Sequence, residues 1–144
     1  MAVNLQFVCD SRTLSESTAL DFGTVVAGQS SSIKTVAVTN LGSSDAQQVV
    51  INPVEASIAN GFAANIQVGT SAETYLAQRF APASDSGTWY NYAVLGTGKN
   101  WSNKTGGTIQ NTSGSDTFYT KWEPPTSGTN GQKVWGNQVT CVYV

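Results

Sequence analysis

The sequence predicts one all-β domain over residues 1–144, an antiparallel β-sandwich of about eight or nine strands with long loops in its second half. Three observations predict this fold. Apolar and polar residues alternate with period two in many short segments. Clusters of Gly, Pro, Asn and Ser separate these segments, and no segment shows the i, i+3, i+4, i+7 pattern of an amphipathic helix over three turns. The expected strands are 3–7, 19–26, 33–40, 49–51, 64–68, 76–80, 88–95, 117–122 and 139–143.

The first half of the chain shows the strand pattern most clearly. Val3, Leu5 and Phe7 alternate with polar residues, which is typical of a half-buried strand. The next two strands are rich in Val, and a turn at 27–30 separates them. We expect the fourth strand to stop at Pro53, because proline cannot donate a hydrogen bond to a sheet ladder.

Alternation continues in the second half, where aromatic residues are more frequent. Residues 96–107 predict a long loop of Gly, Asn, Lys and Thr around Trp101, and residues 127–131 predict an extended turn. Val139, Cys141 and Tyr143 predict one face of a last strand. We expect the side chains buried between the sheets to include Phe22, Val36, Val38, Ile66, Phe118 and Trp122.

Charge and hydropathy patterning argue against two classes of partner. Charged residues make up only 11% of the chain, the formal net charge is −2, and the seven basic residues are scattered. Nucleic-acid binding needs clustered Lys and Arg, so we do not expect it.

No apolar run reaches the roughly 18–20 residues of a membrane helix, and the N-terminus lacks the pattern of a signal peptide. We therefore expect synthesis in a cytoplasm, no Sec-dependent secretion and no membrane partner.

One segment resembles a known family. Residues 20–29, Leu-Asp-Phe-Gly-Thr-Val-Val-Ala-Gly-Gln, and residues 36–42, Val-Ala-Val-Thr-Asn-Leu-Gly, resemble the opening of bacterial and viral Ig-like domains. They are similar to the ASPM/SPD-2/Hydin group, which is related to the major-sperm-protein fold. The resemblance implies an Ig-like β-sandwich with a binding or scaffolding role. From Asn60 on, the sequence is similar in style to phage tail and capsid accessory proteins.

The residues in this segment have a physical interpretation. Phe22 and Val25 can fill the core between two sheets. Gly23 and Gly28 permit sharp backbone turns, and the Asn-Leu-Gly sequence at 40–42 can form a left-handed turn at the end of a strand.

The chemistry-bearing residues argue against catalysis. The chain has no His, which removes Ser-His-Asp and Cys-His arrangements and the usual mononuclear zinc sites. Asp10 with Glu16, or Asp116 with Glu123, could form the acid/base pair of a glycosidase. We expect instead that the acids are surface and turn residues. The Gly-Thr-Gly-Lys sequence at 96–99 lacks the rest of a P-loop, and no calcium motif is present. We therefore expect no enzymatic activity, no cofactor and no bound metal.

Cys9 and Cys141 are the two cysteines, and their spacing matches no metal motif. They are either two small buried strand residues or a disulfide between the first and last strands. Cytoplasmic synthesis favours thiols, which we expect.

The aromatic residues are the candidates for an interaction site. All four Trp lie in the second half, and Trp101 and Trp135 lie among Gly and Asn, where a core position is less natural. Exposed Trp and Tyr can anchor a protein interface or stack on sugar rings. The alternative is that the loop Trp fold back over an edge of the sandwich. The candidates for interface or ligand residues are Trp101, Trp135, Trp89, Tyr90, Tyr92 and Tyr119.

Among the functions compatible with these features, we expect a non-catalytic structural or assembly protein of a virus particle. The expected location is the virion, as a phage capsid decoration, a head fibre or a tail or baseplate accessory subunit. Its partners would be other virion proteins and copies of itself, with the strands at 3–9 or 139–144 available for edge pairing. On this hypothesis, alanine at Trp101 or Trp135 leaves thermal stability unchanged. The alternative is a carbohydrate-binding or host-adhesion module that uses exposed Trp and Tyr on a host surface glycan. A small hydrolase is disfavoured by the lack of His.

Overall fold

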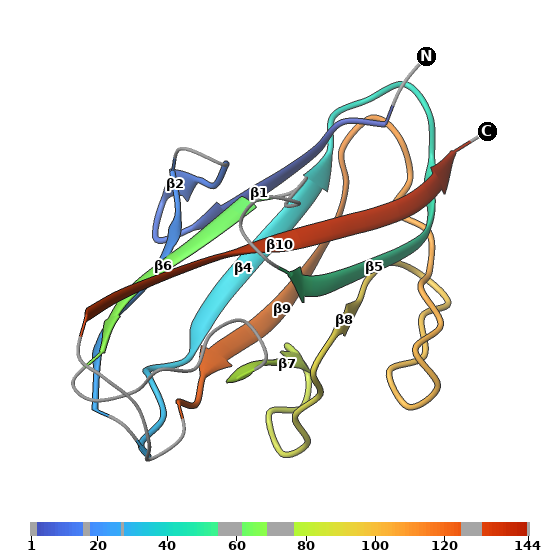
Figure 1. Ribbon diagram of the computed structural model, residues 1–144. Coiled ribbons are helices and arrows are strands. Elements are labelled where there is room, and N and C mark those ends of the chain that lie inside the picture. The colour runs from blue at the N-terminus through green and yellow to red at the C-terminus, as the bar shows by residue number, and fades with distance from the viewer. Residues whose placement is uncertain are drawn as a thin grey trace.

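The computed structural model describes residues 3–15, 18–26, 28–54, 62–68, 77–124 and 131–143. In these ranges the chain forms two five-stranded sheets, packed face to face around one core, and contains no α-helix (Figure 1). The predicted all-β sandwich is confirmed. The strand β1 (Leu5–Cys9) begins and the strand β10 (Gly131–Tyr143) ends at the same end of the sandwich (Figure 1).

The first sheet, sheet A, is antiparallel throughout. Its first two strands form a hairpin at Asp10-Ser11, where both residues have positive φ values of 53° and 63°. A two-residue type I′ turn requires such values. The polar run at 11–13 therefore reverses the chain into a short strand rather than simply ending the first one. In spatial order sheet A contains β2 (Arg12–Thr13), β1 (Leu5–Cys9), β4 (Lys34–Asn40), β9 (Gly114–Trp122) and β7 (Gln78–Pro82).

The second sheet, sheet B, contains one parallel pair, β3 (Leu20–Val25) with β6 (Phe62–Val68), while its other pairs are antiparallel. The register of β3 shifts between Asp21 and Gly23, where Gly23 has a φ of 76° and its N–H donates to the Asp21 carboxylate at 2.8 Å. In spatial order sheet B contains β3 (Leu20–Val25), β6 (Phe62–Val68), β10 (Gly131–Tyr143), β5 (Ala46–Val54) and β8 (Ala93–Val94).

β5 and β10 of sheet B are much longer than the sequence indicates. β5 runs through Pro53 to Val54, so the expected stop at Pro53 is wrong. β8 pairs only with Val50 and Ile51, and at Pro53 β5 therefore has a described neighbour on its β10 side alone. A strand tolerates proline at such an edge-like position. β10 begins at Gly131 rather than near residue 139, and it lies at the centre of the sheet.

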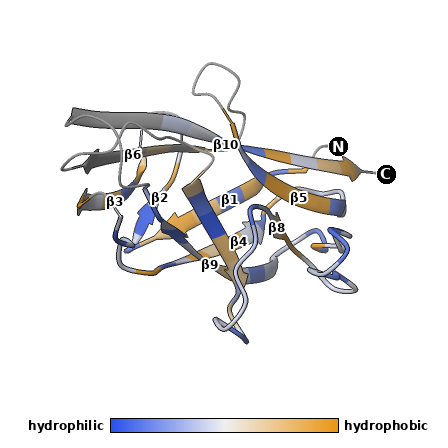
Figure 2. Ribbon diagram, turned by 60° about the horizontal axis from the view of Figure 1, so that its bottom comes forward, coloured by the Kyte–Doolittle hydropathy of each residue, from blue (hydrophilic) through white to orange (hydrophobic). Residues whose placement is uncertain are grey.

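The core is formed by the inward-facing residues of both sheets. Bands of hydrophobic and hydrophilic residues alternate along the strands of each layer (Figure 2), as half-buried strands require. The predicted core residues are buried, with exposed fractions of 3% or less, except that the side chain of Ile66 lies outside the described residues. Those confirmed are Phe22, Val36, Val38, Phe118 and Trp122.

A stack of aromatic rings and one buried amide connect the two sheets. Trp135 of sheet B lies between Phe22 and Trp122, at ring-centroid distances of 5.9 and 5.6 Å. Its indole Nε1 donates to Oε1 of Gln78 on sheet A at 2.7 Å. The other end of the same amide donates to Oγ1 of Thr120 at 3.0 Å. All the polar atoms of this buried link are therefore hydrogen-bonded, as the interior of a protein requires.

A second buried amide, that of Asn40, lies at the last residue of β4 and hydrogen-bonds to the backbone of neighbouring segments. Its Oδ1 accepts hydrogen bonds from the backbone N–H groups of Asn4 and Gly42, and its Nδ2 donates to the carbonyl oxygens of Ser44 and Ile109. Neither Asn40 nor Gly42 has a positive φ, so the expected left-handed turn is wrong. Asn40 instead satisfies backbone groups from three separate segments.

Both cysteines are free thiols, as expected. Burial raises the pKa of Cys9, and the neighbouring Asp10 raises it further. Burial also raises the pKa of Cys141. Neither thiol therefore has the lowered pKa of a reactive cysteine.

The buried Gln78 link predicts a clear loss of stability when its amide is removed. Gln78→Met keeps the side-chain length but leaves the Trp135 indole N–H without an acceptor. We expect the free energy of unfolding, measured by chemical denaturation, to fall by about 1–3 kcal/mol.

Asn137 supplies the matched control. It is fully buried on β10, yet neither its Oδ1 nor its Nδ2 has a hydrogen-bond partner. Asn137→Leu removes an unsatisfied amide, so we expect the free energy of unfolding to stay the same or rise. Equal destabilisation by the two substitutions would contradict the proposed role of Gln78.

Candidate interaction surface

The six aromatic candidates divide into two groups. Trp135 is fully buried and Trp101 is 8% exposed, so the expectation that these two Trp are exposed anchors is wrong. Trp89, Tyr90, Tyr92 and Tyr119 are half-buried. Tyr119 lies on the outer face of sheet A and Trp89 contacts Lys121 of that face, while Tyr90 and Tyr92 contact Trp101.

Trp135 belongs to the core because β10 is the central strand of sheet B. β10 pairs with β6 on one side, where Trp135 lies opposite Ala64. On its other side β10 pairs with β5, where Gly136 lies opposite Val54. Gly and Asn are poor strand formers, so the local sequence is typical of a loop. Two flanking strands and the burial of a large indole outweigh that local preference.

Residues 90–94 close one side of the sandwich. Tyr90 exchanges two backbone hydrogen bonds with Phe80, each 2.7 Å long, and so extends sheet A beyond β7. Three residues later, Ala93 and Val94 pair with β5 at the edge of sheet B. The predicted strand at 88–95 is therefore a short crossing from one sheet to the other.

The predicted loop around Trp101 is an irregular hairpin. Thr97 pairs with Thr108 and Asn100 pairs with Thr105, in each case through two backbone hydrogen bonds of 2.8–3.0 Å. Trp101 at the tip folds back against Tyr90, with the ring centroids 5.3 Å apart. The loop Trp therefore covers an edge of the sandwich, which was the alternative interpretation of the sequence.

The base of this hairpin is fixed by close packing and charge. A Cβ atom on Gly107 would lie 2.5 Å from the Thr97 carbonyl oxygen, so only glycine fits there. The Asp116 carboxylate accepts hydrogen bonds from the Gly96 N–H at 2.7 Å and from Lys99 Nζ at 2.6 Å. Asp116 is thus a structural anchor of the hairpin.

The remaining aromatic rings do not form a flat platform. Tyr90 is tilted by 45° to Tyr92 and by 43° to Trp101. Lys121 Nζ lies over the Trp89 ring, 4.2 Å from its centroid, and so occupies one face of it. Stacking on a sugar needs an open ring face, and a flat polysaccharide needs several coplanar rings.

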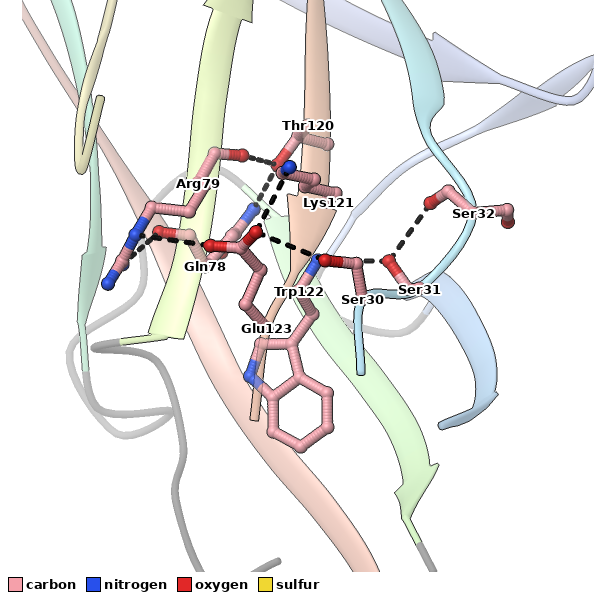
Figure 3. A network of polar contacts seen from close by, with 9 residues as sticks. All are labelled: Ser30, Ser31, Ser32, Gln78, Arg79, Thr120, Lys121, Trp122 and Glu123. Atoms are coloured by element: carbon pink, nitrogen blue, oxygen red, sulfur yellow. Dashed lines mark hydrogen bonds and ion pairs between the residues drawn. The ribbon is translucent and has the colours of Figure 1, made fainter. Parts of the chain in front are cut away.

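The polar network at the other end of β9 centres on Glu123 (Figure 3). Its carboxylate accepts a hydrogen bond from Ser30 Oγ at 3.0 Å and pairs with Lys121 Nζ at 3.0 Å. Arg79 Nε lies 3.8 Å from the other carboxylate oxygen. The network joins the 28–32 turn to the ends of β7 and β9.

The electrostatics of this network make Glu123 a weak base. Burial opposes ionisation, but hydrogen bonds from Lys121 and Ser30 and the charges of Lys121 and Arg79 outweigh it, so the pKa of Glu123 is lowered. A carboxyl group suited to general acid or base catalysis near neutral pH needs a raised pKa. The geometry therefore assigns Glu123 a structural role.

The suggested carboxylate pairs do not meet the distance that glycoside hydrolysis needs. Asp116 lies on β9 and Glu123 directly follows that strand, so the seven residue steps from one to the other span about 23 Å. The two acids of a glycosidase are only about 5–9.5 Å apart. Asp10 pairs with Lys34 at 3.1 Å, and Glu16 lies outside the described residues. Among the residues with described positions, no three His, Cys, Asp or Glu side chains gather into a possible metal site.

The outer face of sheet A is the surface that these contacts leave open. It consists of the outward side chains of β1, β4, β9 and β7, which alternate with the buried ones. The register places them in rows across the strands. The sequence missed this surface because single alternating Thr and Ala residues give no signal of their own. The outer face comprises Gln6, Val8, Thr35, Ala37, Thr39, Arg79, Ser115, Thr117, Tyr119 and Lys121, whereas Ala81 of β7 is fully buried.

Comparison with known proteins gives no match to a protein family or to a curated protein. The resemblance of residues 20–42 to Ig-like domains stays a prediction. The physical expectations for that segment do hold at four positions: Phe22 and Val25 are buried, and Gly23 and Gly28 have φ values of 76° and 84°. No helix in the described parts of the chain is long and apolar enough to cross a membrane.

The packing of Trp101 predicts that it contributes to stability. Trp101→Ala removes a buried indole from the cluster with Tyr90, and we expect a loss of about 3–5 kcal/mol in the free energy of unfolding. Trp89→Ala is the control, because Trp89 is half-buried and its cation–π contact contributes less. An unchanged melting temperature for Trp101→Ala would restore the interpretation of Trp101 as an exposed anchor.

The lowered pKa of Glu123 predicts a pH-dependent contribution to stability. Because the folded pKa lies below the ordinary value of 4.5, this contribution is present above that value and is lost as the pH falls through the folded pKa. We expect the native chain to melt at a higher temperature than Glu123→Gln at neutral pH, and this difference to shrink in acid. A difference that stays constant with pH would argue against the ionised clamp.

Proposed function

We propose that this chain is a non-catalytic structural or assembly protein of a virus particle. Within a phage it would serve as a capsid decoration, a head fibre or a tail or baseplate accessory subunit, and contact other virion proteins and copies of itself. The observation that carries the proposal is the outer face of sheet A. That face presents Tyr119 among small residues and has Arg79 and Lys121 as its charged side chains.

The composition of this face is suited to protein contact. Interface centres are depleted of charged residues and enriched in aromatic residues such as Tyr. Arg79 and Lys121 lie in one corner, opposite each other on β7 and β9, and both contact Glu123. The rest of the face consists of uncharged side chains, so a partner can cover it without desolvating an ion.

The hydrogen bonds that the Asp and Glu carboxylates of the described residues accept support the non-catalytic part of the proposal. Asp21 and Asp85 accept the N–H of the glycine two residues later, at 2.8 Å in both cases. Asp45 holds the backbone and side-chain amides of Asn111 at 2.8 and 2.9 Å. Together with Asp116 and Glu123, these acids fix turns and loops, which is a structural use of charge.

The glycan-binding alternative has weaker support. It requires exposed, coplanar rings, whereas Tyr90, Tyr92 and Trp101 are tilted against one another and Lys121 covers one face of Trp89. Tyr119 remains available to a protein partner because it lies on a sheet face rather than in the ring cluster.

Co-sedimentation tests the proposed function. Antibodies raised against the chain are used to follow it through a density gradient of virus particles from the source culture. We expect the chain to band with the particles and to stay with them after a high-salt wash. Recovery in the soluble fractions only would overturn the proposal, and retention on host polysaccharide without particle association would favour the adhesion alternative.

A further inference from the structure

The edge strands of the two sheets differ in how much of their backbone is available to another chain. An edge strand presents backbone N–H and C=O groups that can pair with a foreign strand. β2 and β8 contain only two residues each, and Phe80 of β7 exchanges two backbone hydrogen bonds with Tyr90. Among the described strands, β3 is therefore the longest edge, with six residues and with β6 as its one neighbour in sheet B.

The composition of β3 favours pairing between chains. It contains Leu20, Phe22 and Val25, and the residue that follows it, Val26, is 55% exposed. No other large hydrophobic side chain in the described ranges is exposed to that extent. Short segments with large apolar and β-branched residues at a sheet edge are the usual starting points of intermolecular β-pairing. This edge therefore needs a feature that prevents such pairing.

A bulge interrupts β3 in its middle. Asp21 lies opposite Asn65 of β6 and Gly23 lies opposite Ile66, so Phe22 is an extra residue between two consecutive partners. A bulge bends its strand and increases the local twist. Six residues of β3 span about 20 Å, and a straight foreign strand cannot follow that length across the bend.

The side chain of Asp21 adds a second obstacle at the same point. It is exposed, and its Oδ1 accepts the Gly23 N–H at 2.8 Å, so this backbone donor is already used within the strand. The carboxylate also leaves a negative charge on the edge. Two copies of β3 side by side would bring two such charges together, which is unfavourable.

We infer that the bulge and the Asp21 carboxylate together keep β3 from pairing with a strand of another chain. Charged side chains and bulges are two of the ways in which natural sheets protect their edges. A Cβ atom on Gly23 would meet nothing within 4 Å, so glycine is needed there for its φ of 76° and not for space. The inference does not depend on the proposed function.

Asp21→Val tests the inference, because valine removes the charge and the hydrogen-bond acceptor without changing the number of residues in the bulge. The matched control is Asp85→Val. Asp85 is also exposed and accepts the N–H of Gly87, two residues later, at 2.8 Å, but it lies in a loop outside the described strands. We expect the two variants to stay folded and to have similar free energies of unfolding, measured by chemical denaturation.

Light scattering and thioflavin fluorescence follow assembly of the folded chains at neutral pH. We expect Asp21→Val to assemble roughly tenfold faster than the native chain, and Asp85→Val to assemble at the native rate. In the assembled Asp21→Val variant, hydrogen exchange should show new protection of the backbone amides of β3. Adding Thr24→Asp to this variant returns a carboxylate to an exposed position of the same strand, and we expect it to slow assembly to the native rate.

Four results would contradict the inference. Asp21→Val could assemble no faster than the native chain, or Asp85→Val could assemble as fast as Asp21→Val. New amide protection could be confined to strands other than β3. Assembly could also begin only under conditions in which Asp21→Val has unfolded. If the double variant with Thr24→Asp assembled as fast as Asp21→Val, the role of the carboxylate charge would be wrong.

Discussion

The hydrogen bond from the Trp135 indole to Gln78 is the interaction on which the rest of the sandwich depends. It crosses the core from the central strand of sheet B to the edge strand β7 of sheet A, and the same amide continues to Thr120 on β9. Stacking of Trp135 between Phe22 and Trp122 adds large buried apolar area at the same point. A hydrogen bond is directional and hydrophobic burial is not. This one contact therefore fixes how the two sheets are aligned, while the surrounding apolar side chains provide most of the driving force.

That alignment determines what the aromatic residues of the second half do. With β7 held against the core, Tyr90 pairs with Phe80 and the chain crosses to β8 within a few residues. The hairpin that follows then folds its Trp101 back over the crossing. The concentration of aromatic residues in this region is explained by the need to close an open side of the sandwich with few residues. Tyr119, on the outer face of sheet A, takes no part in this closure.

The distribution of charge follows the same architecture. Described ion pairs lie at turns and strand ends: Asp10 with Lys34, Asp116 with Lys99, and Glu123 with Lys121 and Arg79. Exposed ion pairs contribute little each, so their main effect here is to hold loops in place. The centre of the sheet A face is left uncharged, because the charged side chains of this sheet gather at one corner, around Glu123.

The sequence by itself determined the fold class, most of the strands and the core face of each, because period-two alternation is a local property. Val36, Val38, Phe118 and Trp122 could be assigned to the core from their neighbours alone. The low charge and the absence of His likewise follow from composition. Tertiary structure alone decided the roles of Trp101, Trp135 and Asn40. Flanking strands stabilise β10 across a Gly-Asn sequence that favours a loop, and packing against Tyr90 buries Trp101 in a hairpin with no hydrophobic period. Tyr119 could be proposed from its residue type, but its place on an uncharged face depended on the register of β4, β9 and β7. Register arises from pairing between segments far apart in the chain, and such pairing leaves no local pattern in the sequence.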